Sequence, residues 1–161
     1  MLPLGKTPVN VGTVDVYVID PSGSDWKVLV LQRGLDTRCP SSWETVHGHI
    51  EAGETTADAA QREVREETGL RIDRLYVVTV QPFFIQKTQT VELAVVFAAF
   101  VAAGQAVALG AEHVRYEWLS VDEATKRLVW PRERAALAEI VDLLGTGDAG
   151  VVEDVLRVPL A

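Results

Sequence analysis

The segment that most constrains the fold of this chain runs from Gly48 to Leu70, with the sequence GHIEAGETTADAAQREVREETGL. Thr55 is a good helix N-cap, and Asp58 three residues later completes a capping box. The residues that follow are mostly good helix formers, without proline or internal glycine. Gly69 then supplies a C-terminal stop signal. The sequence therefore predicts a polar loop that leads into a helix over residues 56–68.

Three carboxylates share one face of this predicted helix. Glu63, Glu66 and Glu67 stand at positions i, i+3 and i+4, where side chains are neighbours. Like charges at these spacings repel one another, and a cation in front of them would turn that repulsion into binding. The alternative is a solvated amphipathic helix with Arg–Glu pairs on its outer face, because such charged faces are common.

Alternating or continuous apolar runs predict several strands around this helix. We expect strands over residues 11–19, 26–32, 43–46, 75–80, 91–103 and 116–119, with residues 81–90 forming a loop or a strand end. The apolar, alanine-rich run over 91–103 also permits a buried helix. Two further helices are predicted, over 121–129 after the cap Ser120 and over 131–144 after Pro131.

Strands with helices between and after them indicate an α/β protein with helices on both faces of a mixed sheet. The length of 161 residues fits one domain, which we expect to span residues 1–145. Residues 146–161 form a tail that the sequence leaves open as an added strand, a dimer arm or a disordered segment.

The charge and the cysteine content limit the function. The net charge of −8 argues against binding to a nucleic-acid polymer, which usually needs a basic patch. A single cysteine, Cys39, cannot form an internal disulfide and suits a reducing compartment. Because we find neither a signal peptide nor an apolar run long enough to span a bilayer, we expect a cytoplasmic protein without membrane contact.

Clustered carboxylates without a Cys/His ligand set favour a hard, oxygen-binding cation. Magnesium fits best, because it binds through a few carboxylates and keeps positions for water and substrate phosphates; manganese is a substitute. Such a cation would neutralise a pyrophosphate group and help an activated water to attack phosphorus in line. The sequence thus favours hydrolysis of a phosphoanhydride.

Written as a pattern with U for an aliphatic residue, the segment reads G-x5-E-x7-R-E-U-x-E-E-x-G-U. This pattern resembles the Nudix box at every position and identifies the chain as similar to the Nudix hydrolases. The resemblance implies an αβα sandwich around a mixed sheet. It also implies metal-dependent cleavage of substrates in which a nucleoside diphosphate is linked to another group.

The same resemblance implies roles for the charged residues of the box. Glu66 and Glu67 would be the principal metal ligands, and Glu63 a ligand or the general base. Arg62 would orient these glutamates rather than contact the metal. Outside the box, GAEHVRYEWLS resembles a segment of nucleotide-hydrolysing Nudix enzymes, in which Glu112 would be a further ligand or base, or else an exposed loop acid.

Four more residues would shape the loop and the helix end. Glu54 would brace the loop, and Gly48 would let the backbone turn so that the carbonyl of His47 reaches the metal. Many family members have glycine where His47 stands. Gly69 would end the helix.

Substrate contacts are less clearly marked in the sequence. Arg33 and Arg38 are candidates for binding phosphate, and Trp43 is a candidate for stacking on a base. Solvation of the arginines and ordinary packing of the tryptophan are the alternatives. His113 is expected to pack or to hydrogen-bond locally.

Segments around the box resemble bacterial pyrophosphohydrolases of dATP and dihydroneopterin triphosphate, so we expect a nucleoside or pterin triphosphate as substrate. The alternatives are ADP-ribose, a dinucleoside polyphosphate, or a Nudix domain that senses a nucleotide without hydrolysing it. Homodimers are common in the family.

Overall fold

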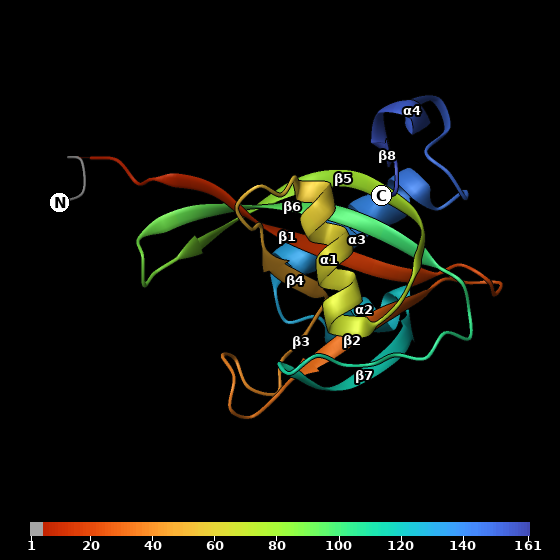
Figure 1. The fold of residues 1–161 in the computed structure, drawn as a ribbon, viewed down its shortest axis with the longest axis horizontal. Helices are drawn as coiled ribbons and strands as arrows, with labels where there is room; N and C mark the ends of the chain where they lie inside the picture. Colours follow the sequence, from red (N-terminus) through yellow and green to blue (C-terminus); the bar gives the residue numbers. More distant parts are fainter. Residues whose placement is uncertain (1–4) are drawn as a thin grey trace.

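Eight strands in one mixed sheet organise the computed structural model, which describes residues 5–161 (Figure 1). Strands β1 and β6 are parallel, and all other neighbouring strands are antiparallel. The main path of the sheet is β3-β2-β1-β6-β5-β8, with β4 paired to β1 and β7 paired to β2. The strands are β1 (Val9–Asp20), β2 (Lys27–Arg33), β3 (Trp43–Glu44), β4 (Val46–His49), β5 (Ile72–Ile85), β6 (Thr90–Val101), β7 (His113–Ser120) and β8 (Arg157–Val158).

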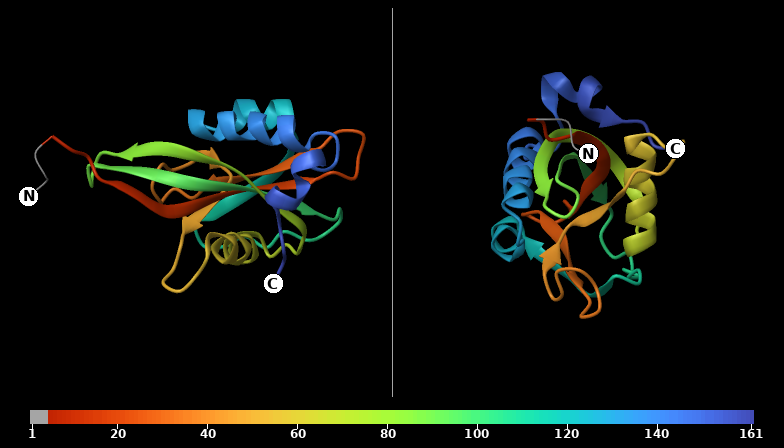
Figure 2. Two further views of the ribbon diagram at one scale, coloured as in Figure 1. Left: turned by 90° about the horizontal axis from the view of Figure 1, so that it is seen from above. Right: turned by 90° about the vertical axis from the view of Figure 1, so that its left-hand side faces the viewer.

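Helices cover both faces of the sheet. Helix α1 (Thr56–Thr68) lies on one face, and α2 (Val121–Arg127) and α3 (Pro131–Leu144) lie on the other, as the left view of Figure 2 shows. This arrangement confirms the predicted α/β class and the αβα layers. No helix within residues 5–161 has the length and apolar character needed to cross a membrane.

Helix α1 begins and ends where its caps predict. The Thr55 hydroxyl accepts the N–H of Asp58 at 3.1 Å, and the Asp58 carboxylate accepts the N–H of Thr55 at 3.0 Å. At the other end Gly69 has φ 70°, a left-handed conformation that costs glycine little, and it donates to the carbonyl of Arg65 at 2.9 Å. The helix of the box is therefore fixed largely by its own sequence.

Side chains of β1 alternate between two hydrophobic cores. Val14, Val16 and Val18 pack towards α1, whereas Tyr17 and Ile19 pack towards α2 and α3. All five are at most 1% exposed. A strand that is buried on both faces is expected when helices cover both sides of a sheet.

The hairpin of β5 and β6 is longer than the sequence predicts. Strand β6 confirms the expected strand and excludes the helix alternative, but β5 continues through Pro82 to Ile85. Pro82 pairs with Leu93 of β6, while β8 pairs only with Leu75 and Tyr76, so the outer edge of β5 is free at Pro82. Proline is tolerated on such an edge, because its missing N–H interrupts no second ladder.

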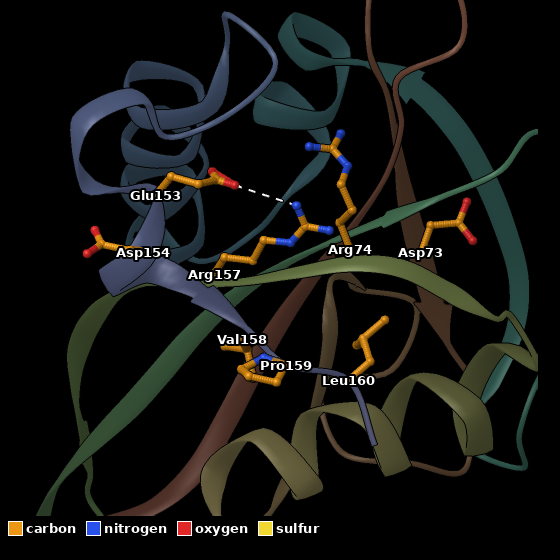
Figure 3. A pocket seen from close by; sticks show the side chains of 8 residues that line it. All are labelled: Asp73, Arg74, Glu153, Asp154, Arg157, Val158, Pro159 and Leu160. Carbon is orange, nitrogen blue, oxygen red and sulfur yellow. Dashed lines mark ion pairs between the residues drawn. The ribbon is translucent and has the colours of Figure 1, made fainter.

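The C-terminal segment folds back onto the sheet through η1 (Gly150–Val152), α4 (Glu153–Leu156) and β8. Figure 3 shows this segment beside β5, with an ion pair of 3.7 Å between Glu153 and Arg157. Glu153 also accepts the hydroxyl of Tyr76 at 2.9 Å. Within the part of the chain described, the tail thus adds a short strand to the edge of β5.

Candidate active site

A cavity of about 1420 Å³ gathers most of the residues that the sequence singles out. Its walls come from α1, the first half of β1, β3 and β4, the loops after β2 and before β7, the β5–β6 hairpin and the start of α3. The carboxylates in its wall include three from α1 and one from the loop before β7. The predicted site residues that line it are Arg33, Arg38, His47, Gly48, Arg62, Glu63, Glu66, Glu67 and Glu112.

Glu67 carries the least favourable charge in this cavity. Its side chain lies in the last turns of α1, only 9% of the residue is exposed, and its Oε2 has no hydrogen-bond partner. Burial, followed by the nearby carboxylates of Glu63, Glu44 and Glu112, raises the pKa of Glu67 to about 9. A cation bound beside Glu67 would remove this penalty, because it would favour the charged carboxylate.

The donor set suits magnesium, but the ligands do not yet converge. Within residues 5–161, no three acidic, histidine or cysteine side chains stand at the spacing of a formed metal site. The carboxylates repel one another, and Arg62 draws two of them, Glu63 and Glu66, towards itself. The carboxylate oxygens around the unpaired Oε2 of Glu67 still suit a hard divalent cation, which would have to draw them together.

Arg62 is the central clamp of the loop–helix segment. Its Nε donates to Glu54 at 2.6 Å, and its Nη2 donates to Glu54 at 3.0 Å and to the carbonyl of His49 at 2.8 Å. Its Nη1 donates to Glu63 at 2.7 Å and to Glu66 at 3.2 Å. The bonds from Arg62 also lower the pKa of Glu54 to about 2. One guanidinium therefore joins the loop to the carboxylate face of α1.

Gly48 is needed because Glu63 packs directly on it. A Cβ atom at residue 48 would overlap the carboxyl group of Glu63. Residue 48 must therefore be glycine to leave room for the Glu63 side chain, and not because of an unusual backbone angle.

Replacement of Gly48 by Ala should therefore lower kcat/KM by about 100-fold, because displacement of a catalytic group by about 1 Å can cost that much. Steady-state kinetics would measure the loss. Gly23→Ala is the matched control, since a Cβ at Gly23 meets its nearest atom at an ordinary 3.5 Å. An unchanged kcat/KM in Gly48→Ala would contradict a role for Glu63 at its present position.

A second network holds Arg33 beside Glu112. Arg33 donates to Glu44 at 2.9 Å and to the carbonyl of Arg38 at 2.6 Å, and it lies 3.6 Å from the carboxylate of Glu112. His113 contacts the same oxygen of Glu44 at 2.8 Å, so this histidine hydrogen-bonds to a neighbour in space that lies 69 residues away in the chain. Although burial opposes it, hydrogen bonds from His113 and Arg33 lower the pKa of Glu44. The sequence did not indicate Glu44, because its partners are distant in the chain.

Trp43 lies outside the cavity, contrary to the stacking role suggested for it. It precedes Glu44 in the same strand, and neighbouring side chains in a strand point to opposite faces. Glu44 lines the cavity, whereas Trp43 packs against the core under α2 and α3. The guanidinium groups of Arg115 and Arg127 lie 5.6 and 4.7 Å from its ring. We therefore propose no substrate contact for Trp43.

Sequence reasoning also missed a largely buried polar cluster in the cavity wall. The carboxylate of Asp15 contacts Nδ1 of His47 and lies 3.5 Å from Nη2 of Arg132. Burial lowers the pKa of His47, but the hydrogen bond to Asp15 and the charge of Asp15 together outweigh burial, so the net shift is upward. Glu133 accepts the N–H of Thr45 at 2.9 Å, and burial raises the pKa of Glu133 to about 8. The one sequence feature that could have indicated this cluster is Asp15, a charged residue within the apolar strand β1.

Two aromatic residues also lie in this part of the wall. Trp130 is 40% exposed and lines the cavity, as does Phe83. Trp130 precedes Pro131 at the start of α3, where the chain turns out of the core.

The pKa of Glu133 gives a pH prediction. Because its folded-state pKa exceeds the ordinary value of 4.5, the folded protein binds a proton that the unfolded chain releases. Glu133 should therefore lower the free energy of unfolding by about 2–4 kcal/mol as pH rises from about 4.5 to about 8. Glu133→Gln should reduce the difference between pH 5 and pH 8 in urea denaturation by about this amount, while Glu67, whose pKa is raised to about 9, keeps its own contribution. The exposed Glu139→Gln on the same helix should leave that difference intact; equal differences in both variants would refute the assignment.

Comparison with known proteins identifies the family and the fold of this chain. The family model described as the NUDIX domain matches residues 9–140. Among solved structures, a NUDIX hydrolase from Listeria monocytogenes superposes with a TM-score of 0.71 at 25% identity, covering 85% of this chain and 96% of that one.

Two curated relatives carry different names. The octanoyltransferase of Myxococcus xanthus is 34% identical over 123 residues, which is 75% of this chain and 34% of that protein. The dihydroneopterin triphosphate diphosphatase of Escherichia coli is 41% identical over 87 residues, which is 54% of this chain and 49% of that protein. A solved structure of the E. coli dihydroneopterin triphosphate pyrophosphohydrolase has a TM-score of 0.67 at 25% identity and covers 85% of this chain and 97% of that chain. This chain thus spans half or less of the length of both curated relatives.

Proposed function

This chain belongs to the Nudix family, and from that premise we propose that it is a metal-dependent pyrophosphohydrolase of a nucleoside or pterin triphosphate. The observation that carries the proposal is the buried carboxylate of Glu67, whose Oε2 has no hydrogen-bond partner, in a large cavity that it shares with seven more glutamates and four arginines. A bound cation would stabilise this carboxylate in its charged form, and the cavity leaves room for a nucleotide-sized substrate.

The metal would be held by Glu63, Glu66, Glu67 and Glu112, together with the backbone carbonyl of His47. When bound, magnesium supplies Lewis acidity and neutralises the charge of the phosphates. All of these protein ligands are oxygen atoms, which suit magnesium, with manganese as a substitute.

The remaining steps belong to the residues of the chain. Arg33 and Arg38 face the cavity and would bind the phosphate oxygens through charge-assisted bonds. Arg62 would keep Glu63 oriented, since it binds this carboxylate and the loop together. Glu63 or Glu112 would accept the proton from the attacking water. The water would break one phosphoanhydride bond, leaving a monophosphate and pyrophosphate.

The substrate class is supported by resemblance and by fit. The E. coli relative is named for dihydroneopterin triphosphate, and its structure covers most of this chain. The cavity combines phosphate-binding groups with the aromatic residues Phe83 and Trp130, which suits a ring joined to phosphates.

A product-release assay tests the proposal. The panel contains nucleoside triphosphates, dihydroneopterin triphosphate, ADP-ribose, NADH and dinucleoside polyphosphates, each with magnesium and then manganese. We expect metal-dependent release of pyrophosphate from a triphosphate. Cleavage of ADP-ribose or a dinucleotide alone would overturn the substrate class, and binding without any cleavage would favour a nucleotide sensor.

A further inference from the structure

Arg132 is a cation that local structure does not explain. It is the second residue of α3, directly after Pro131. The positive end of the helix dipole disfavours a cation in this first turn. Among residues 5–161, Arg132 makes no hydrogen bond, and its Nε is buried without a partner. Its Nε is buried, but Nη1 and the second hydrogen of Nη2 remain to donate to a ligand in the cavity, which Arg132 lines.

Arg132 is nevertheless firmly placed. Its guanidinium carbon lies 4.4 Å from the centre of the Phe83 ring, and Nη2 lies 3.5 Å from the carboxylate of Asp15. Asp15 is 1% exposed and is itself held by the ring of His47. Only 14% of the Arg132 side chain is exposed. These contacts therefore hold the planar guanidinium group of Arg132 in one orientation relative to the cavity.

The surroundings of Arg132 favour a ring over a phosphate. The aromatic side chains of Phe83 and Trp130 line the same cavity and offer flat apolar surface. The carboxylate of Asp15 lies close by and would repel a phosphate. A neutral heterocycle with acceptor atoms fits this combination of charge and shape.

We propose that Arg132 selects an oxo heterocycle, a 6-oxopurine or a 4-oxopteridine, over adenine; this inference rests on the proposed function. An arginine fork matches two neighbouring acceptors, as in O6 and N7 of guanine, whereas adenine places an amino donor beside N7 and suits Asn or Gln instead. A 4-oxopteridine offers the same pair through O4 and N5. Arg132 is thus a specificity-determining residue of the triphosphate site.

The competing explanation is that Arg132 only balances the buried charge of Asp15. Arg132→Lys separates the two roles, because lysine keeps the positive charge beside Asp15 but lacks the planar fork. Arg132→Gln is the complementary variant, because glutamine matches the amino and ring nitrogen of adenine.

The test compares kcat/KM for dGTP, dITP, 7-deaza-dGTP and dATP in the magnesium-loaded enzyme. We expect wild type to prefer dGTP over dATP by about 5- to 150-fold, the range of one bidentate base contact. dITP, which keeps O6 and N7, should match dGTP, and 7-deaza-dGTP, which lacks N7, should lose most of the preference. Arg132→Lys should lose it while thermal unfolding is unchanged, and Arg132→Gln should shift it towards dATP.

Calorimetric binding of dGMP and dAMP tests the same inference without turnover. If no triphosphate is hydrolysed, the proposed function fails, but tighter binding of dGMP by wild type than by Arg132→Lys would still support the role of Arg132. Equal use of dGTP and dATP, or a preference that survives Arg132→Lys, would overturn the inference and leave the proposed function standing. An equal loss for every substrate in both variants would indicate a phosphate contact and would also overturn it.

Discussion

Replacement of Glu67 by Gln should lower metal-dependent turnover by about a thousandfold or more while the fold remains intact. Loss of one metal ligand removes several kcal/mol of transition-state stabilisation by the cation. Glutamine is nearly isosteric and carries no charge, so it avoids the burial penalty and the repulsion that together raise the pKa of Glu67 to about 9 in the metal-free protein. We therefore expect the variant without metal to unfold at or above the wild-type temperature at pH 8.

When magnesium is added, the order of the unfolding temperatures should reverse, with wild type above Glu67→Gln. Magnesium at about a hundredfold its dissociation constant stabilises a folded protein by about 2.7 kcal/mol. For a domain of this size that corresponds to roughly 5–10 °C in unfolding temperature. Wild type should show this rise by calorimetry, and Glu67→Gln should show little of it. The exposed Glu139→Gln should behave as wild type in both assays, and wild-type turnover in Glu67→Gln would refute the placement of the metal.

Local signals explain which parts of this structure the sequence predicts. The caps Thr55 and Gly69 lie within one turn of the helix that they bound, so α1 is predicted to the residue. The spacing of Glu63, Glu66 and Glu67 places them on one face for the same reason. The long run of β6 is predicted as a strand because its apolar residues continue across both faces of the sheet.

Features that depend on distant partners escape this reasoning. The continuation of β5 through Pro82 depends on which edge of the strand is free, and this is set by the short pairing of β8. The direction of Trp43 is set by Glu44, whose partner His113 lies 69 residues away. Asp15 and Arg132 lie near opposite ends of the chain although their side chains are 3.5 Å apart, so no local sequence pattern could have predicted the contact.

The second large effect should come from Arg62, because one side chain holds both the loop and the catalytic face. Arg62→Ala would leave the carboxylates of Glu54 and Glu63, at 17% and 12% side-chain exposure, without their counter-ion. Removal of one partner from such a network costs about 2–4 kcal/mol of unfolding free energy, and the loosened Glu63 should cost about 100-fold in kcat/KM.

Arg62→Lys should recover part of the stability but little of the activity, since an ammonium cannot bind Glu54, Glu63 and the His49 carbonyl with one rigid fork. Urea denaturation and steady-state kinetics on the same preparations would measure both quantities. Arg65→Ala, an exposed arginine on the same helix, is the matched control and should change neither by much. Full activity in Arg62→Lys would mean that Arg62 acts as a charge alone, whereas loss of activity with unchanged stability would place it in direct contact with the substrate.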